Sequence, residues 1–212
     1  MIRAVIFDMD GVVSDTQGLH TAVEESLLRK HGIRMSAQEI TEKYASVPDK
    51  EFFGKLFKEH KVSVNPDSVI KEKYRIMSAS KSRIVPIAGV KELIQELKKQ
   101  KFMLAIASAS PLEFIEFVIS ELGLKGIFDS ITSSNEVSRG KPEPDVFLLA
   151  AKKLGCKPEE CVVIEDTSRG MTAAKRAGMK CIGFAWDHEK EYPADILVKD
   201  LREITVEMIR GM

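Results

Sequence analysis

The sequence predicts an α/β fold, in which a parallel sheet with helices on both faces is interrupted by an inserted helical domain. Two observations predict it. From about residue 83 onward, short apolar runs alternate with segments of helical periodicity. Residues 3–7 form an apolar run of the same kind, but residues 14–82 after it show helical patterns and no convincing strand. One core built from both ends of the chain explains both observations.

The elements of this core are expected where strand-length apolar runs alternate with helical patterns. Ser110 is the expected N-cap of one helix, because Ser110-Pro111-Leu112-Glu113 has the pattern of a capping box with proline at the first helical position. We expect strands at residues 3–7, 102–107, 161–164, 180–185 and 196–198, and helices at residues 90–100, 111–122, 145–154 and 168–177.

The inserted segment is expected to contain helices only. Ser36 with Glu39 forms a second capping box, and Asn65 stands before a proline as another N-cap. Gly32 is the expected end of the first helix, and residues 49–60 carry apolar side chains on one face. We therefore assign residues 1–14 and 82–212 to a Rossmann-like α/β core, and residues 15–81 to a helical cap.

The composition excludes several classes of function. The 32 Lys and Arg side chains balance 32 Asp and Glu side chains, which argues against a general nucleic-acid binder. No apolar run approaches the roughly 18 residues of a membrane span, and the apolar start is too short for a signal peptide. The three cysteines form no CxxC pair and are expected to be buried free thiols. A cytoplasmic monomer is the resulting expectation.

Polar side chains follow the first predicted strand, at the edge of a parallel sheet where ligands bind. The strand runs into Asp8-Met9-Asp10-Gly11, and two carboxylates two residues apart on extended chain point in the same general direction. This pattern indicates a nucleophile or metal ligand paired with an acid–base group. A polar strand end is the alternative interpretation.

Three further segments are expected to contribute candidate functional side chains at the same edge of the sheet. Ser108 stands before a helix N-terminus, which can hold an anion, although a simple turn residue is the alternative. Lys141 lies in a loop stiffened by two prolines, where it would neutralise phosphate, although a lone loop lysine is usually solvated. The adjacent acids Glu165 and Asp166 favour Mg²⁺, with a helix N-cap as the alternative for either.

Together these motifs resemble the haloacid dehalogenase-like superfamily of phosphotransferases. The matching segments are Phe7-Asp8-Met9-Asp10-Gly11-Val12, Ala107-Ser108-Ala109-Ser110, Gly140-Lys141-Pro142-Glu143-Pro144-Asp145 and Ile164-Glu165-Asp166-Thr167-Ser168-Arg169-Gly170. They stand in the order that the superfamily has, and the resemblance covers nearly the whole chain. It is closest to the subfamily that contains β-phosphoglucomutase and small sugar-phosphate phosphatases.

The resemblance implies catalytic roles. Asp8 is implied as the nucleophile that forms an aspartyl-phosphate, and Asp10 as the acid and then the base. Ser108 and Lys141 are implied to hold the transferring phosphoryl group. The implied Mg²⁺ ligands are Asp8, Asp10 through its backbone carbonyl, Glu165 directly or through water, and Asp166.

The resemblance also implies residues that serve substrate binding and cap movement. Ala109 and His20 are the implied substrate contacts, and Thr16 would lie at the hinge of the cap. An ordinary histidine at the edge of the core is the alternative for His20, and both mutases and phosphatases carry histidine there.

One segment of the expected cap departs from the mutase pattern. The mutases carry a Gly-Val-Ser-Arg-like segment whose Arg holds the distal phosphate of a bisphosphate, and the corresponding stretch here is Ser46-Val47-Pro48-Asp49. Asp49 therefore reverses the charge where an anion should lie. Lys50, Lys71 and Lys73 are candidates to compensate, although each is expected to face solvent.

The expected function is a Mg²⁺-dependent phosphatase of a small phosphorylated metabolite, with sugar or polyol phosphates as the substrate class. A β-phosphoglucomutase-type mutase is the alternative, favoured by His20 and the Ala-Ser-Ala-Ser run. A non-catalytic phosphate-binding protein on the same fold is a remote alternative. No nucleic acid or membrane partner is expected.

Overall fold

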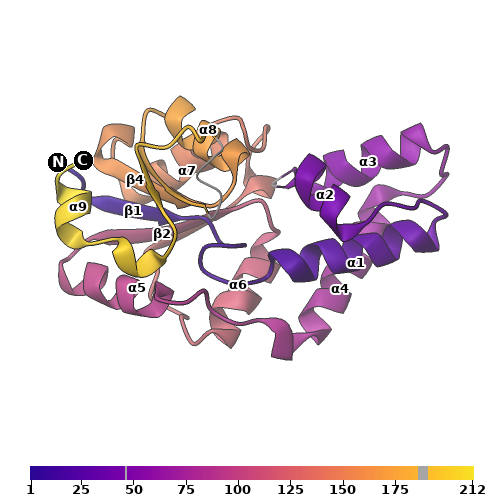
Figure 1. Cartoon of the computed structure of the whole chain (residues 1–212), viewed down its shortest axis with the longest axis horizontal. Helices are drawn as coiled ribbons and strands as arrows, with labels where there is room; N and C mark the ends of the chain where they lie inside the picture. Colours follow the sequence, from indigo (N-terminus) through magenta and orange to yellow (C-terminus); the bar gives the residue numbers. More distant parts are fainter. Residues whose placement is uncertain (46, 186–190) are drawn as a thin grey trace.

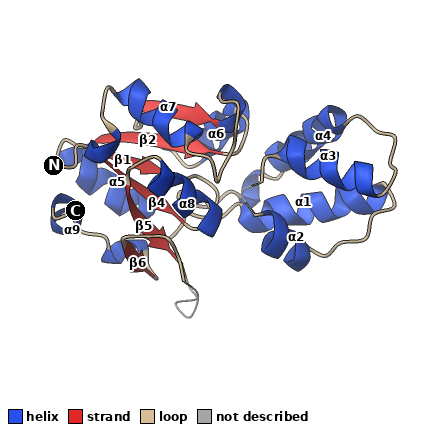
Figure 2. Cartoon of the chain, turned by 90° about the horizontal axis from the view of Figure 1, so that it is seen from above, coloured by secondary structure: helices blue, strands red, loops and turns tan. Residues whose placement is uncertain are grey.

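A computed structural model describes residues 1–45, 47–185 and 191–212. Within these residues the strands form one parallel sheet with the order β3-β2-β1-β4-β5-β6 (Figure 2). The order reverses between β1 and β4, which makes the carboxyl ends of these two central strands the expected ligand position. The strands are β1 (Ala4–Phe7), β2 (Met103–Ser108), β3 (Ser130–Ser133), β4 (Cys161–Glu165), β5 (Lys180–Phe184) and β6 (Ile196–Val198).

Helices cover both faces of the sheet, as predicted. Helices α7 and α8 lie on one face, and α5 and α6 lie on the other (Figure 1). Because successive residues of a strand point to opposite faces, Val5 and Phe7 of β1 pack with α5 and α6, whereas Ala4 and Ile6 pack with α7 and α8. The helices of this part are α5 (Val90–Lys99), α6 (Leu112–Glu121), α7 (Asp145–Leu154), α8 (Ser168–Arg176) and α9 (Val206–Arg210). Short 3-10 turns lie at Lys81–Arg83, Ser134–Glu136, Pro158–Glu160 and Leu201–Glu203.

Strand β3 was not predicted from the sequence. Its residues, Ser130–Ser133, read Ser-Ile-Thr-Ser and lack the apolar run on which the other strands were recognised. The strand lies at the edge of the sheet and pairs with β2 only. An edge strand needs less apolar surface than a strand that is buried on both sides, so its sequence signal is weaker.

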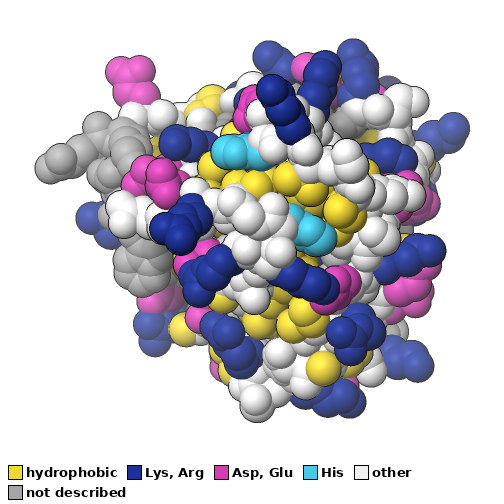
Figure 3. All heavy atoms as spheres, turned by 90° about the vertical axis from the view of Figure 1, so that its right-hand side faces the viewer, with side chains coloured by type: hydrophobic (Ala, Val, Ile, Leu, Met, Phe, Trp, Pro, Cys, Tyr) yellow, Lys and Arg dark blue, Asp and Glu magenta, His cyan; other side chains and the backbone are white. Residues whose placement is uncertain are grey.

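Helices α1 to α4 lie together beyond the carboxyl ends of the strands, and we call them the helical unit (Figures 1 and 2). They are α1 (Gln17–Lys30), α2 (Ala37–Tyr44), α3 (Asp49–Glu59) and α4 (Pro66–Ala79). The predicted caps are confirmed: Ser36 and Glu39 form a capping box, and the Asn65 side chain accepts from the Asp67 N–H at 2.9 Å. Lys and Arg side chains surround an apolar area on the outer end of this unit (Figure 3).

The two segments that join the helical unit to the sheet run beside each other. The Asp15 N–H donates to the Val85 carbonyl at 2.9 Å, and Ser14 forms a bridge with Pro86. The cysteines are buried and free, as expected. In the described part of the chain, no helix combines the length and the apolar character needed to cross a bilayer.

Candidate active site

Three carboxylates meet at the carboxyl ends of β1 and β4. Asp8 follows β1 directly, and its N–H donates to the Ile164 carbonyl of β4 at 3.0 Å. Glu165 ends β4, and Asp166 comes next. One oxygen each of Asp8, Glu165 and Asp166 lies within 4.8 Å of the others. The parallel pairing of β1 and β4 therefore brings together acids that are far apart in the sequence.

Lys141 is the cation of this carboxylate cluster. Its buried ammonium donates to Asp8 Oδ1 at 2.6 Å and to Glu165 Oε1 at 2.7 Å. The Arg169 guanidinium donates to the Lys141 carbonyl at 2.7 Å and so holds the loop in place. The other Glu165 oxygen accepts from the N–H and the hydroxyl of Thr167, at 2.6 and 2.9 Å. Both Glu165 oxygens thus have protein donors.

Asp166 has a different environment from Glu165. Its Oδ1 atom is buried and has no hydrogen-bond partner among the residues that the structure describes. Gly11 packs closely against it with φ +94°, and a Cβ at Gly11 would lie 2.1 Å from Asp166 Oδ2. Only glycine adopts this φ readily and leaves room for the carboxylate. The unpartnered oxygen indicates that Asp166 is free to bind a cation.

The charges of the cluster also fit a divalent cation. Asp8, Glu165 and Asp166 against Lys141 give a formal charge of −2. Burial, followed by repulsion from Glu165 and Asp8, raises the pKa of Asp166 well above its usual value. Burial raises the pKa of Asp8 to about 7, although Lys141 opposes this change. Since Mg²⁺ prefers carboxylate oxygens and would restore the balance of charge, these residues fit a magnesium site.

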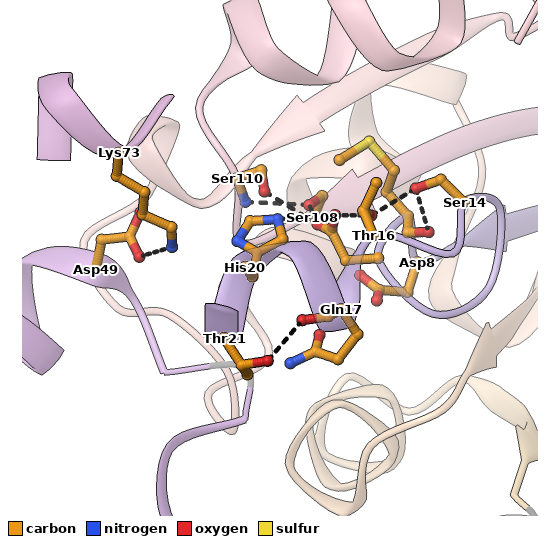
Figure 4. A network of polar contacts seen from close by, with 12 residues as sticks. Asp8, Ser14, Thr16, Gln17, His20, Thr21, Asp49, Lys73, Ser108 and Ser110 are labelled. Atoms are coloured by element: carbon orange, nitrogen blue, oxygen red, sulfur yellow. Dashed lines mark hydrogen bonds and ion pairs between the residues drawn. The ribbon is translucent and has the colours of Figure 1, made fainter. Parts of the chain in front are cut away.

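Asp10 has its own network of hydrogen bonds, and its partners Thr16, His20, Ser108 and Ser110 are labelled in Figure 4. Its Oδ1 accepts from the Thr16 hydroxyl at 2.5 Å and lies 3.0 Å from His20 Nε2. Its Oδ2 accepts from the hydroxyls of Ser108 and Ser110, at 3.2 and 3.0 Å. Although burial opposes ionisation, the His20 ring and the hydrogen bonds from His20, Thr16 and Ser110 hold the pKa of Asp10 well below its usual range. The network favours an ionised Asp10.

The predicted role of Ser110 as an N-cap was wrong. Pro111 occupies the N-cap position of α6, and no side chain caps this helix. The Ser110 hydroxyl donates to Asp10, and its N–H donates to Ser108 Oγ at 3.0 Å. Ser110 thus lies one position before the N-cap, and its hydroxyl serves the site as a donor to the Asp10 carboxylate, a charge-assisted hydrogen bond.

A cavity of about 50 Å³ lies between the strand ends and the helical unit. Of the residues predicted from the sequence, Asp8, Asp10, His20 and Ala109 line this cavity. Lys141 and Ser108 do not line it, but Lys141 donates to Asp8 and Ser108 donates to Asp10. Ser46 lies outside the described residues, but Asp49 lines the cavity. Lining residues that the sequence did not indicate include Gln17, Glu24, Ile40, Tyr44, Ala45 and Tyr74.

The expectation that Lys73 faces solvent was wrong. Its side chain is 1% exposed, and its ammonium donates to Glu24 at 2.6 Å and to Asp49 at 2.5 Å. The packing of α4 against α1 and α3 encloses it, and no local pattern around Lys73 signals this burial. Lys50 and Lys71 are exposed, as expected.

Comparison with known proteins gives consistent matches. A family model described as haloacid dehalogenase-like hydrolase matches residues 5–184, which include every motif of the candidate site. The chain is 28% identical over 210 residues to validoxylamine A 7'-phosphate phosphatase of Streptomyces hygroscopicus subsp. limoneus, covering 96% of each protein. It is 29% identical over 222 residues to hexitol phosphatase B of Escherichia coli, covering 99% of this chain and 97% of the relative.

A solved structure extends the match to the whole fold. The β-phosphoglucomutase of Clostridium difficile superposes with a TM-score of 0.88 at 26% identity, covering 100% of this chain and 96% of the other.

Proposed function

The chain belongs to the haloacid dehalogenase-like hydrolases, and we propose that it is a Mg²⁺-dependent phosphatase of small phosphate monoesters, namely sugar or polyol phosphates. The observation that carries this proposal is the position of Asp8. Its buried carboxylate follows the central strand, lies 2.6 Å from the Lys141 ammonium and lines a cavity. The two phosphatases that match along nearly their whole length support the proposed activity.

The proposed reaction has two steps on the protein's own carboxylates. Asp8 attacks the phosphorus atom, the bond to the alcohol oxygen breaks, and Asp10 gives that oxygen a proton. Water then attacks the aspartyl-phosphate and passes a proton to Asp10, so that phosphate leaves and both carboxyl groups return to their starting states. Lys141 orients Asp8 and neutralises charge on the transferring group, while Ser108 turns its hydroxyl from Asp10 to a phosphoryl oxygen.

The ionised form of Asp10 suits the second step, in which it accepts a proton. The first step needs the protonated form. A bound phosphate dianion beside Asp10 raises its pKa and so supplies that form. His20 belongs to the helical unit, which we propose acts as a cap of residues 15–81 over a core of residues 1–14 and 82–212, with Thr16 at the hinge. The contact of His20 with Asp10 at 3.0 Å belongs to the closed position of this proposed cap, and closure would exclude bulk water from the site.

We propose that Asp8 and Asp166 hold Mg²⁺ through side-chain oxygens and Asp10 through its backbone carbonyl. When bound, the cation would offset the repulsion between the Asp8 carboxylate and the phosphate of the substrate. Glu165 already accepts from Lys141 and Thr167, so its proposed part is to position Lys141 and to reach the cation through water.

A phosphosugar mutase is the second candidate, because the fold matches β-phosphoglucomutase along the whole chain. The structure favours the phosphatase: Asp49 and Lys73 form an ion pair where the mutase pattern has an Arg for a second phosphate. Phosphorus NMR of β-glucose 1-phosphate with Mg²⁺ and a trace of glucose 1,6-bisphosphate separates the two. A mutase would yield glucose 6-phosphate, a phosphatase free phosphate, and a non-catalytic binder neither.

The direct test is phosphate release from a panel of sugar, polyol and carboxylate phosphates with Mg²⁺. We expect Asp8→Asn to lower kcat by at least about 1,000-fold, as removal of a nucleophile does elsewhere. Asp67→Asn, an exposed change on α4, is the matched control and should retain activity. Full turnover by Asp8→Asn, with the amide verified by mass spectrometry, would contradict the nucleophile. Activity after complete removal of divalent cations would contradict the Mg²⁺ requirement.

A further inference from the structure

Three helices of the helical unit each contribute one charged side chain to a buried group in the cavity. Lys73 of α4 lies between Glu24 of α1, at 2.6 Å, and Asp49 of α3, at 2.5 Å. The Lys73 side chain is 1% exposed, and the two carboxylate side chains are 11% and 14% exposed. We call these residues the Glu24–Asp49–Lys73 group. The reaction proposed above uses none of them.

The formal charge of this group is −1, from two carboxylates and one ammonium. Although burial opposes its charge, Asp49 and Glu24 raise the pKa of Lys73, so the lysine remains an ammonium. Its charge is already matched by two close carboxylates. The many Lys and Arg side chains seen in Figure 3 lie on the outer surface of the helical unit. A phosphate dianion brought to the group would therefore meet net negative charge.

Neutral hydroxyl groups fit the same place. Each carboxylate has about four acceptor sites and an ammonium has three donors, so the Lys73 contacts leave capacity on the group. Gln17 and Tyr74 line the same cavity and add an amide and a phenol. Burial, together with the charge of Asp49, raises the pKa of Tyr74 well above its usual value, which keeps its hydroxyl protonated. This part of the cavity is therefore lined by both hydrogen-bond donors and hydrogen-bond acceptors.

The group lies where the far end of a substrate would be. Figure 4 shows Asp49 and Lys73 on one side of His20 and Asp8 on the other. All four residues line one cavity. A compound that presents its phosphate to Asp8 would direct its remaining atoms past His20 toward the Glu24–Asp49–Lys73 group.

We propose that the Glu24–Asp49–Lys73 group determines substrate specificity, accepting the uncharged, hydroxyl-bearing end of a phosphate monoester and rejecting a second phosphate. The inference rests on the proposed phosphatase function and narrows its substrate class to polyhydroxy monophosphates. Specificity here is a difference between two affinities, set by hydroxyl contacts on one side and by like-charge repulsion on the other.

The test compares kcat/KM for fructose 1-phosphate and fructose 1,6-bisphosphate in a series of variants. The wild type, Asp49→Asn and the double variant Glu24→Gln/Asp49→Asn carry −1, 0 and +1 at the group. Asp67→Asn makes the same charge change on an exposed part of α4 and is the matched control. Acetyl phosphate, an acyl phosphate, serves as a third substrate that is too short to reach the group. Its hydrolysis reports whether each variant keeps a working core, and thermal melting reports whether it folds.

We expect the wild type to prefer the monophosphate by about 100-fold, because like charge at a buried recognition site strongly suppresses the wrong partner. Each carboxylate removed should reduce the preference by about 10-fold. Turnover of acetyl phosphate and the preference of Asp67→Asn should both stay at wild-type values. If the double variant does not fold, each single variant tests the same 10-fold step on its own.

Two results would overturn the inference while the proposed function stands. One is a wild type that hydrolyses both fructose phosphates equally well. The other is a preference that Asp49→Asn and Glu24→Gln leave unchanged while acetyl phosphate is still hydrolysed. By contrast, a wild type that hydrolyses none of these three phosphates and none of the panel described above would refute the phosphatase itself.

Discussion

Asp166→Asn is expected to stabilise the protein in the absence of divalent cations and to destabilise it relative to wild type in their presence. Asp166 belongs to a cluster with a formal charge of −2, and its buried Oδ1 has no partner among the described residues. Replacing one carboxylate by an amide removes repulsion but also removes a proposed ligand. The sign of the effect should therefore depend on Mg²⁺.

The magnitude follows from the distances. The oxygens of Asp8, Glu165 and Asp166 lie within 4.8 Å of one another. At that separation two like charges repel by about 3–4 kcal/mol at an effective dielectric constant of about 20. Asp166 has two such repulsions, and Lys141 offsets about one of them. Partial protonation relieves some of the remainder, leaving about 2–3 kcal/mol, or about 4–12 °C in Tm for a chain of this size.

The pH dependence has a defined sign. A carboxyl group whose folded-state pKa is raised binds more protons in the native than in the unfolded protein. The metal-free wild type should therefore lose stability as the pH rises above about 4, with the loss complete above the folded-state pKa values. Asp8, whose pKa is raised to about 7, contributes to the same loss. The Asp166→Asn variant should show a shallower decline.

The assay is urea or thermal unfolding of wild type, Asp166→Asn and the control Asp67→Asn, each in chelator and in saturating Mg²⁺. Mg²⁺ should stabilise the wild type by about 4.1 kcal/mol at a concentration of about 1,000 times Kd, which exceeds its deficit of about 2–3 kcal/mol in chelator, and should scarcely affect Asp166→Asn. The order of stability of these two proteins should thus invert between the two conditions. A variant that is less stable in chelator, or that gains as much from Mg²⁺ as the wild type, would refute the reasoning.

Two further predictions concern stability. Gly170→Ala should lower the free energy of unfolding by about 1–3 kcal/mol, because the added methyl group overpacks the site against Glu165. The displaced Glu165 should also reduce phosphate release. A Cβ there would lie 1.6 Å from Glu165 Oε1, whereas Gly18→Ala, with no atom within 4 Å, is the matched control. Gly18→Ala should be neutral or stabilise by about 0.5–1 kcal/mol. Both changes can be measured by urea unfolding. Asp195 accepts from Lys175 at 2.7 Å and from a β5 N–H at 2.7 Å. Burial favours the protonated form of Asp195, but these hydrogen bonds outweigh it and lower the pKa of this carboxyl group. The ionised Asp195 therefore stabilises the folded protein above a pH of about 4, and this contribution is lost below that pH. Asp195→Asn should cost about 1–2 kcal/mol at neutral pH and flatten the acid side of the stability profile. A variant whose stability falls at acid pH as steeply as that of the wild type would contradict the stabilising role of ionised Asp195.

Most of the core could be predicted because its elements carry local signals. Strands β4 and β6 and helix α7 begin at the predicted residues, since apolar runs and helical periodicity depend on neighbours in the chain. Strand β3 was missed because it pairs with β2 on one side only and has a polar sequence. The Ser110 cap was wrong because α6 begins one residue later than expected, with Pro111 at the N-cap, and the Ser110 hydroxyl donates to a carboxylate from another strand end.

The sequence by itself determined that acids, a serine and a lysine would meet at one edge of a parallel sheet. It could do so because the carboxyl ends of parallel strands meet at one edge, whatever the details of packing. Only the tertiary structure decided that Thr16 and His20 hold Asp10. It also decided that Lys73 is enclosed by Glu24 and Asp49, which are far from it in the sequence. Such contacts depend on how whole helices pack, and the pattern around any one residue does not record that.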